Sequence, residues 1–339
     1  MSANEFLTLS DIQQNSDNLL KNAIIQCFRK KSVFLDQITI ETTGTMHVKN
    51  MRAGKINQIG NRKIGAPRPI VMHEKPDMVE DAMYIYSNRI QIPTQNVDFK
   101  DKGNLYDPVA WNIEATATSM ARQITTDVIN NTPTANPDAL VGMRWRVDNS
   151  ANVSEIKIPA SGTNGTALDL DPAGANYQQN IRQFKRILDT AKDVCAEGEP
   201  DFILCNNTFI NVQSSIWADS NYLKTTEDSL HRIFVDWDGV KYIDMGNEDE
   251  DLVSYTKVIK DYENAYGVDG TAGTDKCTSI YLVKMGEEFW QMVQAESMNT
   301  SELYKDADRI NYCVDFDWEI GHLITHPRSV VRLYGLKLN

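Results

Sequence analysis

The chain has 339 residues, with 41% hydrophobic side chains, six Trp, thirteen Tyr and a formal net charge of −13. A chain of this length and composition buries a sizeable core, which excludes a disordered protein. The acidic balance argues against a simple nucleic-acid binder, because binding phosphates requires a basic surface. No apolar run approaches the roughly 18 residues of a membrane span, and the N-terminus lacks a secretory signal pattern.

The N-terminal region predicts a helical arm followed by a hairpin-like loop. Residues 9–35 place Leu20, Ile24 and Phe28 at helical spacing. An apolar stripe of this kind needs another surface to cover it. Residues 38–72 alternate weakly between apolar and polar around a tip rich in Gly and Asn, which predicts a long hairpin without a core of its own.

Basic residues are concentrated in this predicted hairpin. Residues 43–75 contain seven Lys and Arg against Glu74 alone, so they carry +6 and leave −19 on the rest of the chain. A basic island on an acidic chain favours contact with another copy of the same protein, although an ordinary solvated loop fits the composition equally well. The contact hypothesis assigns inter-subunit contacts to Lys49, Arg52, Lys55, Arg62, Lys63 and Arg68.

The clearest predicted element is a long helix at residues 108–130, after a strand at 81–93 whose apolar residues alternate. Asp107 is placed to cap the helix and Pro108 to begin it, and Pro133 lies beyond its end. At ~1.5 Å per residue the helix is a rod of roughly 35 Å, about twice the average length. The side chains expected to pack on a sheet are Val109, Ile113, Met120 and Ile124.

Downstream, the pattern predicts a mixture of helices and strands, and hence an α+β fold. Helices are expected at 177–198 and 207–219. An acidic run at 248–251 is expected to be a charged loop, solvated or facing a partner, rather than a cation site, because its spacing misses the Ca²⁺-loop pattern. Strands are expected at 140–147, 201–205, 239–246 and 278–286, and in the long alternation from 312 to 338.

No catalytic, cofactor or metal site is expected from the motifs. The sequence has no G-x-S-x-G, H-E-x-x-H, phosphate-binding or dinucleotide-binding pattern. His322 and His326 lie four apart in a predicted strand, which separates them by about 13 Å and predicts structural histidines. The five cysteines form no C-x-x-C pair and predict reduced core side chains.

Three alternating carboxylates, Asp315, Asp317 and Glu319, share one face of a predicted strand. A glycosidase pair of carboxylates is compatible with this pattern, but no other feature supports a sugar site. The sequence therefore predicts a protein that is not an enzyme. An unburied arm, a long hairpin and a beam-like helix predict a protein that assembles with neighbours.

The order of these elements resembles the major capsid proteins of tailed bacteriophages, which have the Hong Kong 97 fold. The resemblance covers the whole chain in outline and rests on four stretches. They are "LTLSDIQQNSDNLLKNAII" near the start, the 108–130 helix followed by "NPDALVGMRWRV", "ILDTAKDVCAEGEPDFILCNNTFINVQSSI", and the final "WEIGHLITHPRSVVRLYGLKL".

The resemblance implies an N-terminal arm, an extended E-loop hairpin, a peripheral (P) domain with a long spine helix, and an axial (A) domain with a mixed sheet and flanking helices. By this correspondence the arm is 1–40, the E-loop 41–78, the first part of the P domain 79–139 with spine helix 108–130, the A domain 140–275, and the return to the P domain 276–339.

The resemblance further implies a structural subunit that forms pentamers and hexamers of an icosahedral shell around double-stranded DNA. No long scaffolding segment precedes the arm, so a separate scaffolding protein is expected, with a portal protein at one vertex and room for a decoration protein. DNA contact is expected to be weak and non-specific, with no membrane and no cofactor. Localisation is the virion, after assembly in the host bacterial cytoplasm. The alternatives are an encapsulin-like nanocompartment, or a nucleic-acid-binding module using residues 43–75.

Overall fold

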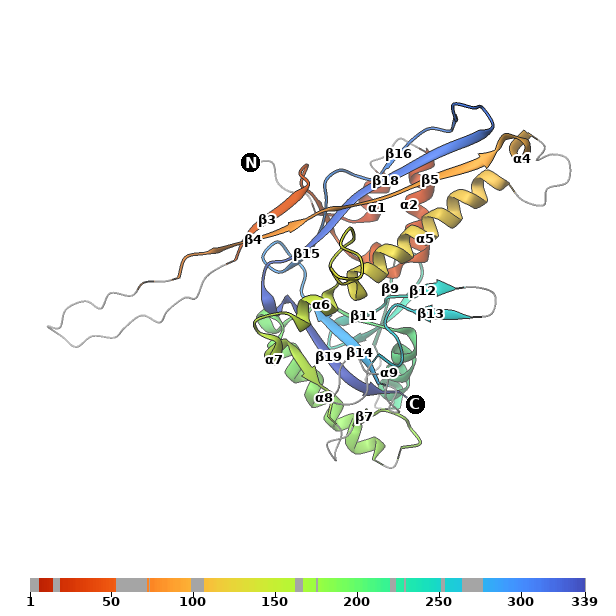
Figure 1. Cartoon of the computed structure of the whole chain (residues 1–339). Coiled ribbons are helices and arrows are strands. Elements are labelled where there is room, and N and C mark those ends of the chain that lie inside the picture. Colours follow the sequence, from red (N-terminus) through yellow and green to blue (C-terminus); the bar gives the residue numbers. More distant parts are fainter. Residues whose placement is uncertain are drawn as a thin grey trace.

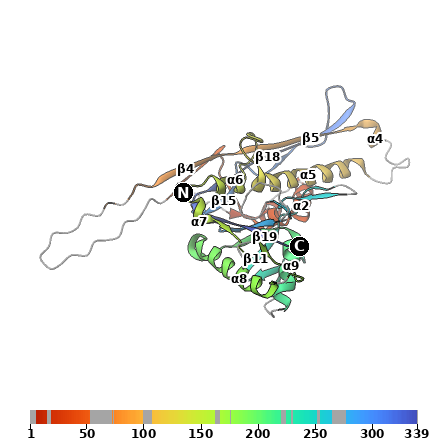
Figure 2. The ribbon, with the colours of Figure 1, turned by 60° about the horizontal axis from the view of Figure 1, so that its bottom comes forward.

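The chain folds around two β-sheets that share a layer of helices (Figure 1). The computed structural model places the paired strands β3 (His47–Arg52) and β4 (Asp77–Ala82) at one end of the body and two long antiparallel strands toward the other (Figures 1 and 2). The residues that the structure describes are 6–14, 19–52, 72, 74–98, 107–161, 167–174, 176–219, 224–228, 230–250, 254–263 and 277–338.

The first sheet has seven described strands and is built on β18 (Asn311–Ile324). β5 (Tyr84–Pro93) pairs antiparallel with β18 over ten residues. The apolar alternation expected for β5 is present, since Ile90 and Ile92 are buried. The remaining strands are β1 (Phe6–Leu7), β2 (Ile40–Thr42), β15 (Trp290–Gln294), β16 (Asn299–Thr300) and β17 (Tyr304–Lys305).

Helices cover one face of this sheet. The spine helix, α5 (Pro108–Asn130), has the bounds expected from the sequence, and the Asp107 carboxylate accepts a hydrogen bond from the Val109 amide (2.9 Å). α2 packs against α5, and residues of both join β5 and β18 in one hydrophobic core. The other helices of this region are α1 (Leu9–Gln14), α2 (Leu19–Lys31), α3 (Val33–Gln37) and α4 (Thr94–Asp98).

The second sheet has eight described strands and its own hydrophobic core under α8 (Tyr177–Val194) and α9 (Asn207–Asp219). Phe184 of α8 and Phe209 of α9 lie in edge-to-face contact, 6.1 Å between ring centroids. A short 3-10 turn, η2 (Ala196–Gly198), follows α8. The strands are β6 (Lys157–Pro159), β7 (Leu168–Asp169), β8 (Phe202–Cys205), β9 (Lys224–Glu227), β10 (Ile233–Trp237), β11 (Val240–Asp244), β14 (Cys277–Val283) and β19 (Val330–Lys337).

Residues 276–339, expected as one return to the P domain, contribute strands to both sheets. β14 and β19 pair with each other from Cys277–Lys337 to Val283–Val330 and lie inside the second sheet, next to β8. Among the described strands of residues 276–339, β15 to β18 belong to the first sheet. All seven residues of β14 are buried, because a central strand is covered on both faces, and such a strand requires long-range partners that local patterns do not reveal.

The strand expected at 140–147 is also wrong, because this segment contains the helix α6 (Met143–Asp148). Met143 and Val147 are buried four residues apart, which is helical spacing. Gly142 precedes the helix and its amide donates to the carbonyl of Asn131 (2.9 Å). A Cβ atom at Gly142 would lie 2.6 Å from the Ile129 carbonyl oxygen, so this close approach requires glycine.

Two hairpins stand outside the main sheets: β3 (His47–Arg52) with β4 (Asp77–Ala82), and β12 (Asn247–Glu250) with β13 (Tyr255–Lys257). The acidic run expected as a loop therefore lies partly on the strand β12. Two short elements complete the described chain, the helix α7 (Val153–Ile156) and the 3-10 turn η3 (Pro327–Ser329). None of the described helices is long and apolar enough to cross a membrane.

Candidate assembly interface

The β3–β4 hairpin carries the first two basic residues assigned to subunit contacts, and both are paired within the hairpin. Lys49 Nζ lies 3.1 Å from a Glu80 carboxylate oxygen, and Arg52 Nη2 lies 3.2 Å from Asp77 Oδ2. The four side chains are well exposed, so these pairs contribute little to stability. The acidic side chains of β4 thus neutralise these two basic side chains of β3.

The remaining assigned residues, Lys55, Arg62, Lys63 and Arg68, lie outside the described residues. They belong to residues 53–71, which carry four basic side chains and no Asp or Glu. The charge that is not balanced within the hairpin strands is therefore concentrated in this segment, which we call the basic segment.

The two faces of the hairpin strands differ in what covers them. Val48 is 5% exposed and packs with Met83, Val293 and Leu323 in a small separate cluster. The opposite face carries Met51 and Met78, which are 69% and 64% exposed, respectively. These two methionines are direct cross-strand partners. A pair of large apolar side chains left in water on a two-stranded hairpin is typical of a surface that another molecule covers.

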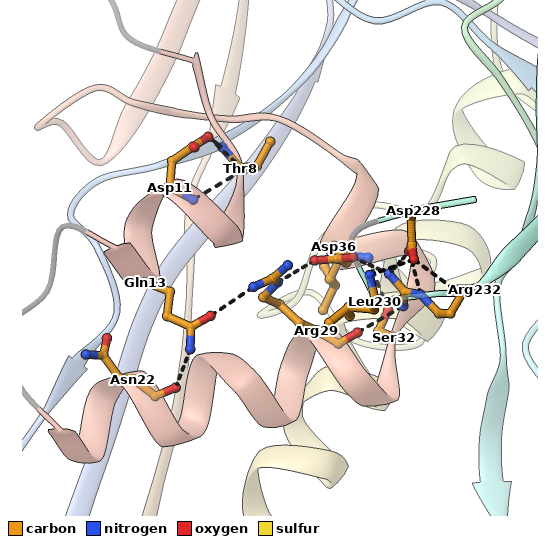
Figure 3. Close-up of polar contacts among 11 residues, drawn as sticks. Thr8, Asp11, Gln13, Asn22, Arg29, Ser32, Asp36, Asp228, Leu230 and Arg232 are labelled. Atoms are coloured by element: carbon orange, nitrogen blue, oxygen red, sulfur yellow. Dashed lines mark hydrogen bonds and ion pairs between the residues drawn. The ribbon is translucent and has the colours of Figure 1, made fainter. Parts of the chain in front are cut away.

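The N-terminal arm is attached to the second sheet by a buried charge cluster around Asp36 of α3 (Figure 3). The Asp36 side chain is 3% exposed. Arg29 Nε donates to Asp36 Oδ1 (2.6 Å), and Arg232 Nη2 donates to the other carboxylate oxygen. Because Arg232 precedes β10, this contact joins the arm to the second sheet.

Each arginine of this cluster has a second partner. Arg232 Nε donates to Asp228 Oδ2 (2.7 Å), and Arg232 Nη1 donates to the Arg29 carbonyl oxygen (3.1 Å). Arg29 Nη1 donates to Gln13 Oε1 (2.9 Å), which ties α1 to α2 (Figure 3). The arm is therefore fixed to the body by directional charge-assisted bonds in addition to its apolar stripe.

The four side chains expected in the spine-helix core are buried to different extents. Ile124 is fully buried and Met120 is 9% exposed, whereas Val109 and Ile113 are half-buried at the edge of the core. Buried polar contacts on this helix were not predicted. Tyr86 of β5 donates a hydrogen bond to Asp127 (2.8 Å), and burial raises the pKa of both side chains.

The two histidines near the C-terminus are structural. His322 is buried, its Nδ1 accepts from the Trp290 indole (3.1 Å), and its Nε2 donates to the Val141 carbonyl oxygen (2.6 Å). Burial, together with the nearby Arg146 charge, lowers the pKa of His322 to about 3, so the ring is neutral near pH 7. His326 accepts the Arg328 amide at the turn into β19.

The three carboxylates of β18 do not form a catalytic pair in the described chain. Asp315 accepts from Arg89 Nε (2.5 Å) and from the Tyr304 hydroxyl (2.7 Å), and these hydrogen bonds lower the pKa of its carboxyl. Asp317 and Glu319 lie further along the same outward face. Among the residues that the structure describes, no cluster of metal-ligating side chains is formed, and the five cysteines are free.

Comparison with protein-family models finds no match, and comparison with curated proteins finds none either. Solved structures do match over most of the chain. The holo-SrpI encapsulin complex from Synechococcus elongatus PCC 7942 is 12% identical, with a TM-score of 0.52, over 88% of this chain and 85% of that chain. The capsid of Myoviridae phage XM1 is 11% identical, with a TM-score of 0.52, over 88% and 90%.

A structure of Microbacterium phage Oxtober96 is 9% identical, with a TM-score of 0.53, over 90% of this chain and 91% of that chain. At such low identities the likeness concerns the fold. The chain has the Hong Kong 97 fold, as the resemblance in its sequence predicts.

Proposed function

We propose that this protein is the structural subunit of a closed icosahedral shell of pentamers and hexamers, the capsid of a tailed bacteriophage. The observation that carries the proposal is the β3–β4 hairpin, which extends beyond the body of the chain and exposes Met51 and Met78 (Figure 1). A two-stranded hairpin with exposed apolar residues gains stability when a neighbouring molecule covers it. Repetition of such contacts around a symmetry axis closes a shell.

The partners follow from this proposal. The subunit assembles chiefly with itself, with a separate scaffolding protein during assembly, a portal protein at one vertex and, in some shells, a decoration protein. The packaged DNA is held by weak non-specific contact, because a net charge of −13 disfavours a tight grip on phosphates. Assembly takes place in the host bacterial cytoplasm, and the shell becomes part of the virion.

An encapsulin-type compartment is the second candidate, since the encapsulin complex matches as well as the phage capsid does. The two shells differ in their contents. Size-exclusion chromatography of the protein expressed in a bacterium, with and without the neighbouring genes of its source, tests the proposal. We expect material in the void volume that protects DNA from nuclease when packaging genes are present. Shells that enclose a specific protein and no DNA would support the compartment.

A nucleic-acid-binding module is the third class of function considered. In that case unassembled protein would shift labelled DNA with a steep dependence on salt, through residues 43–75. We expect no such shift at moderate salt. Protein that remains monomeric at high concentration and binds DNA tightly would replace the shell proposal with this one.

A further inference from the structure

A cavity of about 440 Å³ lies between strand β3 and the part of the first sheet formed by β2 and β15. In the parallel pair β2–β15, Glu41 is the direct partner of Val293, which packs against Val48 of β3. Gln291 lies two residues before Val293 along β15, so its side chain is on the same face of the sheet as Glu41. The volume is within the range of small-molecule sites.

Gln291 brings a buried hydrogen-bond acceptor into this cavity. The residue lines the cavity and is 4% exposed, and its Oε1 atom has no hydrogen-bond partner in the described part of the chain. Buried polar atoms are nearly always hydrogen-bonded in folded proteins, because an unmet buried acceptor lowers stability. Such an atom is satisfied by a ligand that donates a hydrogen bond.

The other polar side chains of the cavity also offer acceptors. The Glu41 side chain lines it from a buried position (3% exposed), and Glu287 lines it from an exposed one. The Thr43 and Thr45 hydroxyls already donate their protons to the carbonyl oxygens of Thr45 and His47 (3.2 and 2.9 Å), so each hydroxyl oxygen remains as an acceptor. This excess of acceptors favours a positively charged ligand with several N–H donors.

The basic side chains at the cavity are directed to an acid of the hairpin itself. Lys49 Nζ and His47 Nδ1 lie 3.1 and 3.6 Å from the carboxylate oxygens of Glu80 on β4. The described residues do not form a cluster of three metal-ligating side chains here, which favours an organic cation over a metal ion. Met46 and Val48 supply an apolar wall along which a carbon chain can lie.

We propose that this cavity binds a linear aliphatic diamine, with one ammonium group at Glu41 and Gln291 and the other at Glu287. An ammonium group has three N–H donors, which suit a carboxylate and an amide oxygen together. The bound diamine joins β2 and β15 to β3, and so fixes the base of the hairpin to the body. The proposal goes beyond the proposed shell function and does not depend on it, because binding is measured on unassembled protein.

Isothermal titration calorimetry of the unassembled protein with 1,4-diaminobutane tests the site. We expect one saturable site per chain, and binding about tenfold weaker for butylamine, which lacks the second ammonium group. Glu287→Gln should also weaken diamine binding about tenfold. The matched control is Asp189→Asn, an exposed carboxylate on α8, which should leave binding unchanged. Absence of saturable binding, or an equal loss in the control, would overturn the proposal.

Gln291→Met separates binding from a structural role. Methionine keeps the length of the side chain but removes the Oε1 atom, so the stability of the protein without diamine should be kept or increased. Binding should nevertheless fall about tenfold, and 1,4-diaminobutane should raise the thermal midpoint of the unmodified protein but not that of the variant. If Gln291→Met lowers the urea midpoint and leaves diamine binding intact, Gln291 is a structural residue and the proposal is wrong.

Discussion

Replacement of Asp36 by Asn removes the charge at the centre of the cluster that joins the arm to the second sheet. The carboxylate is almost fully buried, whereas the side chains of Arg29 and Arg232 are 12% and 23% exposed. After the substitution both guanidinium groups face a neutral amide whose NH₂ group cannot accept their bonds. Removing one partner of a buried ion pair costs about 3–5 kcal/mol.

The surroundings place the expected loss near the lower end of that range. Arg232 keeps its bond to Asp228, and Arg29 keeps its bond to Gln13, so neither charge is left without a partner. We therefore expect Asp36→Asn to lower the free energy of unfolding by about 3 kcal/mol.

Urea unfolding of unassembled protein measures this loss, and limited proteolysis should show earlier cleavage in the arm. The matched control is Asp315→Asn, which breaks a pair on the solvent-exposed face of β18 and should change stability far less. A loss from Asp36→Asn no larger than that from Asp315→Asn would refute the reasoning, because it would mean that the buried cluster contributes no more than a surface pair.

Three further predictions concern the core, a buried histidine and the basic segment. Ile124→Ala should lower stability by about 2–5 kcal/mol and reduce soluble yield, with Ile113→Ala costing less because that side chain is half-buried. The pKa of His322 is about 3 in the folded chain against the ordinary 6.5, so stability should fall below pH 6.5 as the unfolded chain takes up a proton. Urea unfolding should show that the free energy of unfolding falls by about 2 kcal/mol from pH 7 to pH 5, and that this loss is absent in His322→Gln. Arg62→Glu, Lys63→Glu and Arg68→Glu together should leave the monomer's thermal midpoint unchanged and abolish particles; normal particles at normal yield would contradict the role of the basic segment.

Some elements could be predicted from the sequence because their signals are local. The spine helix is bounded by Asp107 and Pro108, whose capping chemistry acts within one turn. β5 is set by an alternation of apolar residues that requires no knowledge of its partner. The outward carboxylates of β18 follow the same period of two.

Other features depend on pairings between distant residues and could not be predicted in this way. The Asp36–Arg232 contact joins residues 196 apart in the chain, and nothing near either residue indicates the other. The place of β14 beside β8 and β19 is likewise decided by long-range pairing. α6 is short and contains Trp145, a residue type that is common in strands. The burial of Met143 and Val147, four residues apart, is what distinguishes it as a helix.

The candidate interface likewise combines a feature that is visible in the sequence with one that depends on strand pairing. The concentration of Lys and Arg in residues 43–75 is visible in the sequence, but their neutralisation is not. The register of β3 with β4 brings Glu80 to Lys49 and Asp77 to Arg52. Only this pairing shows that the unbalanced charge begins beyond Arg52.

Negative-stain electron microscopy of the protein, purified after expression together with the neighbouring genes of its source, tests the central claim most directly. If the chain is a shell subunit, the micrographs should show closed particles of uniform diameter. Micrographs with only monomers or small irregular oligomers, under conditions where the protein is folded by circular dichroism, would contradict the account.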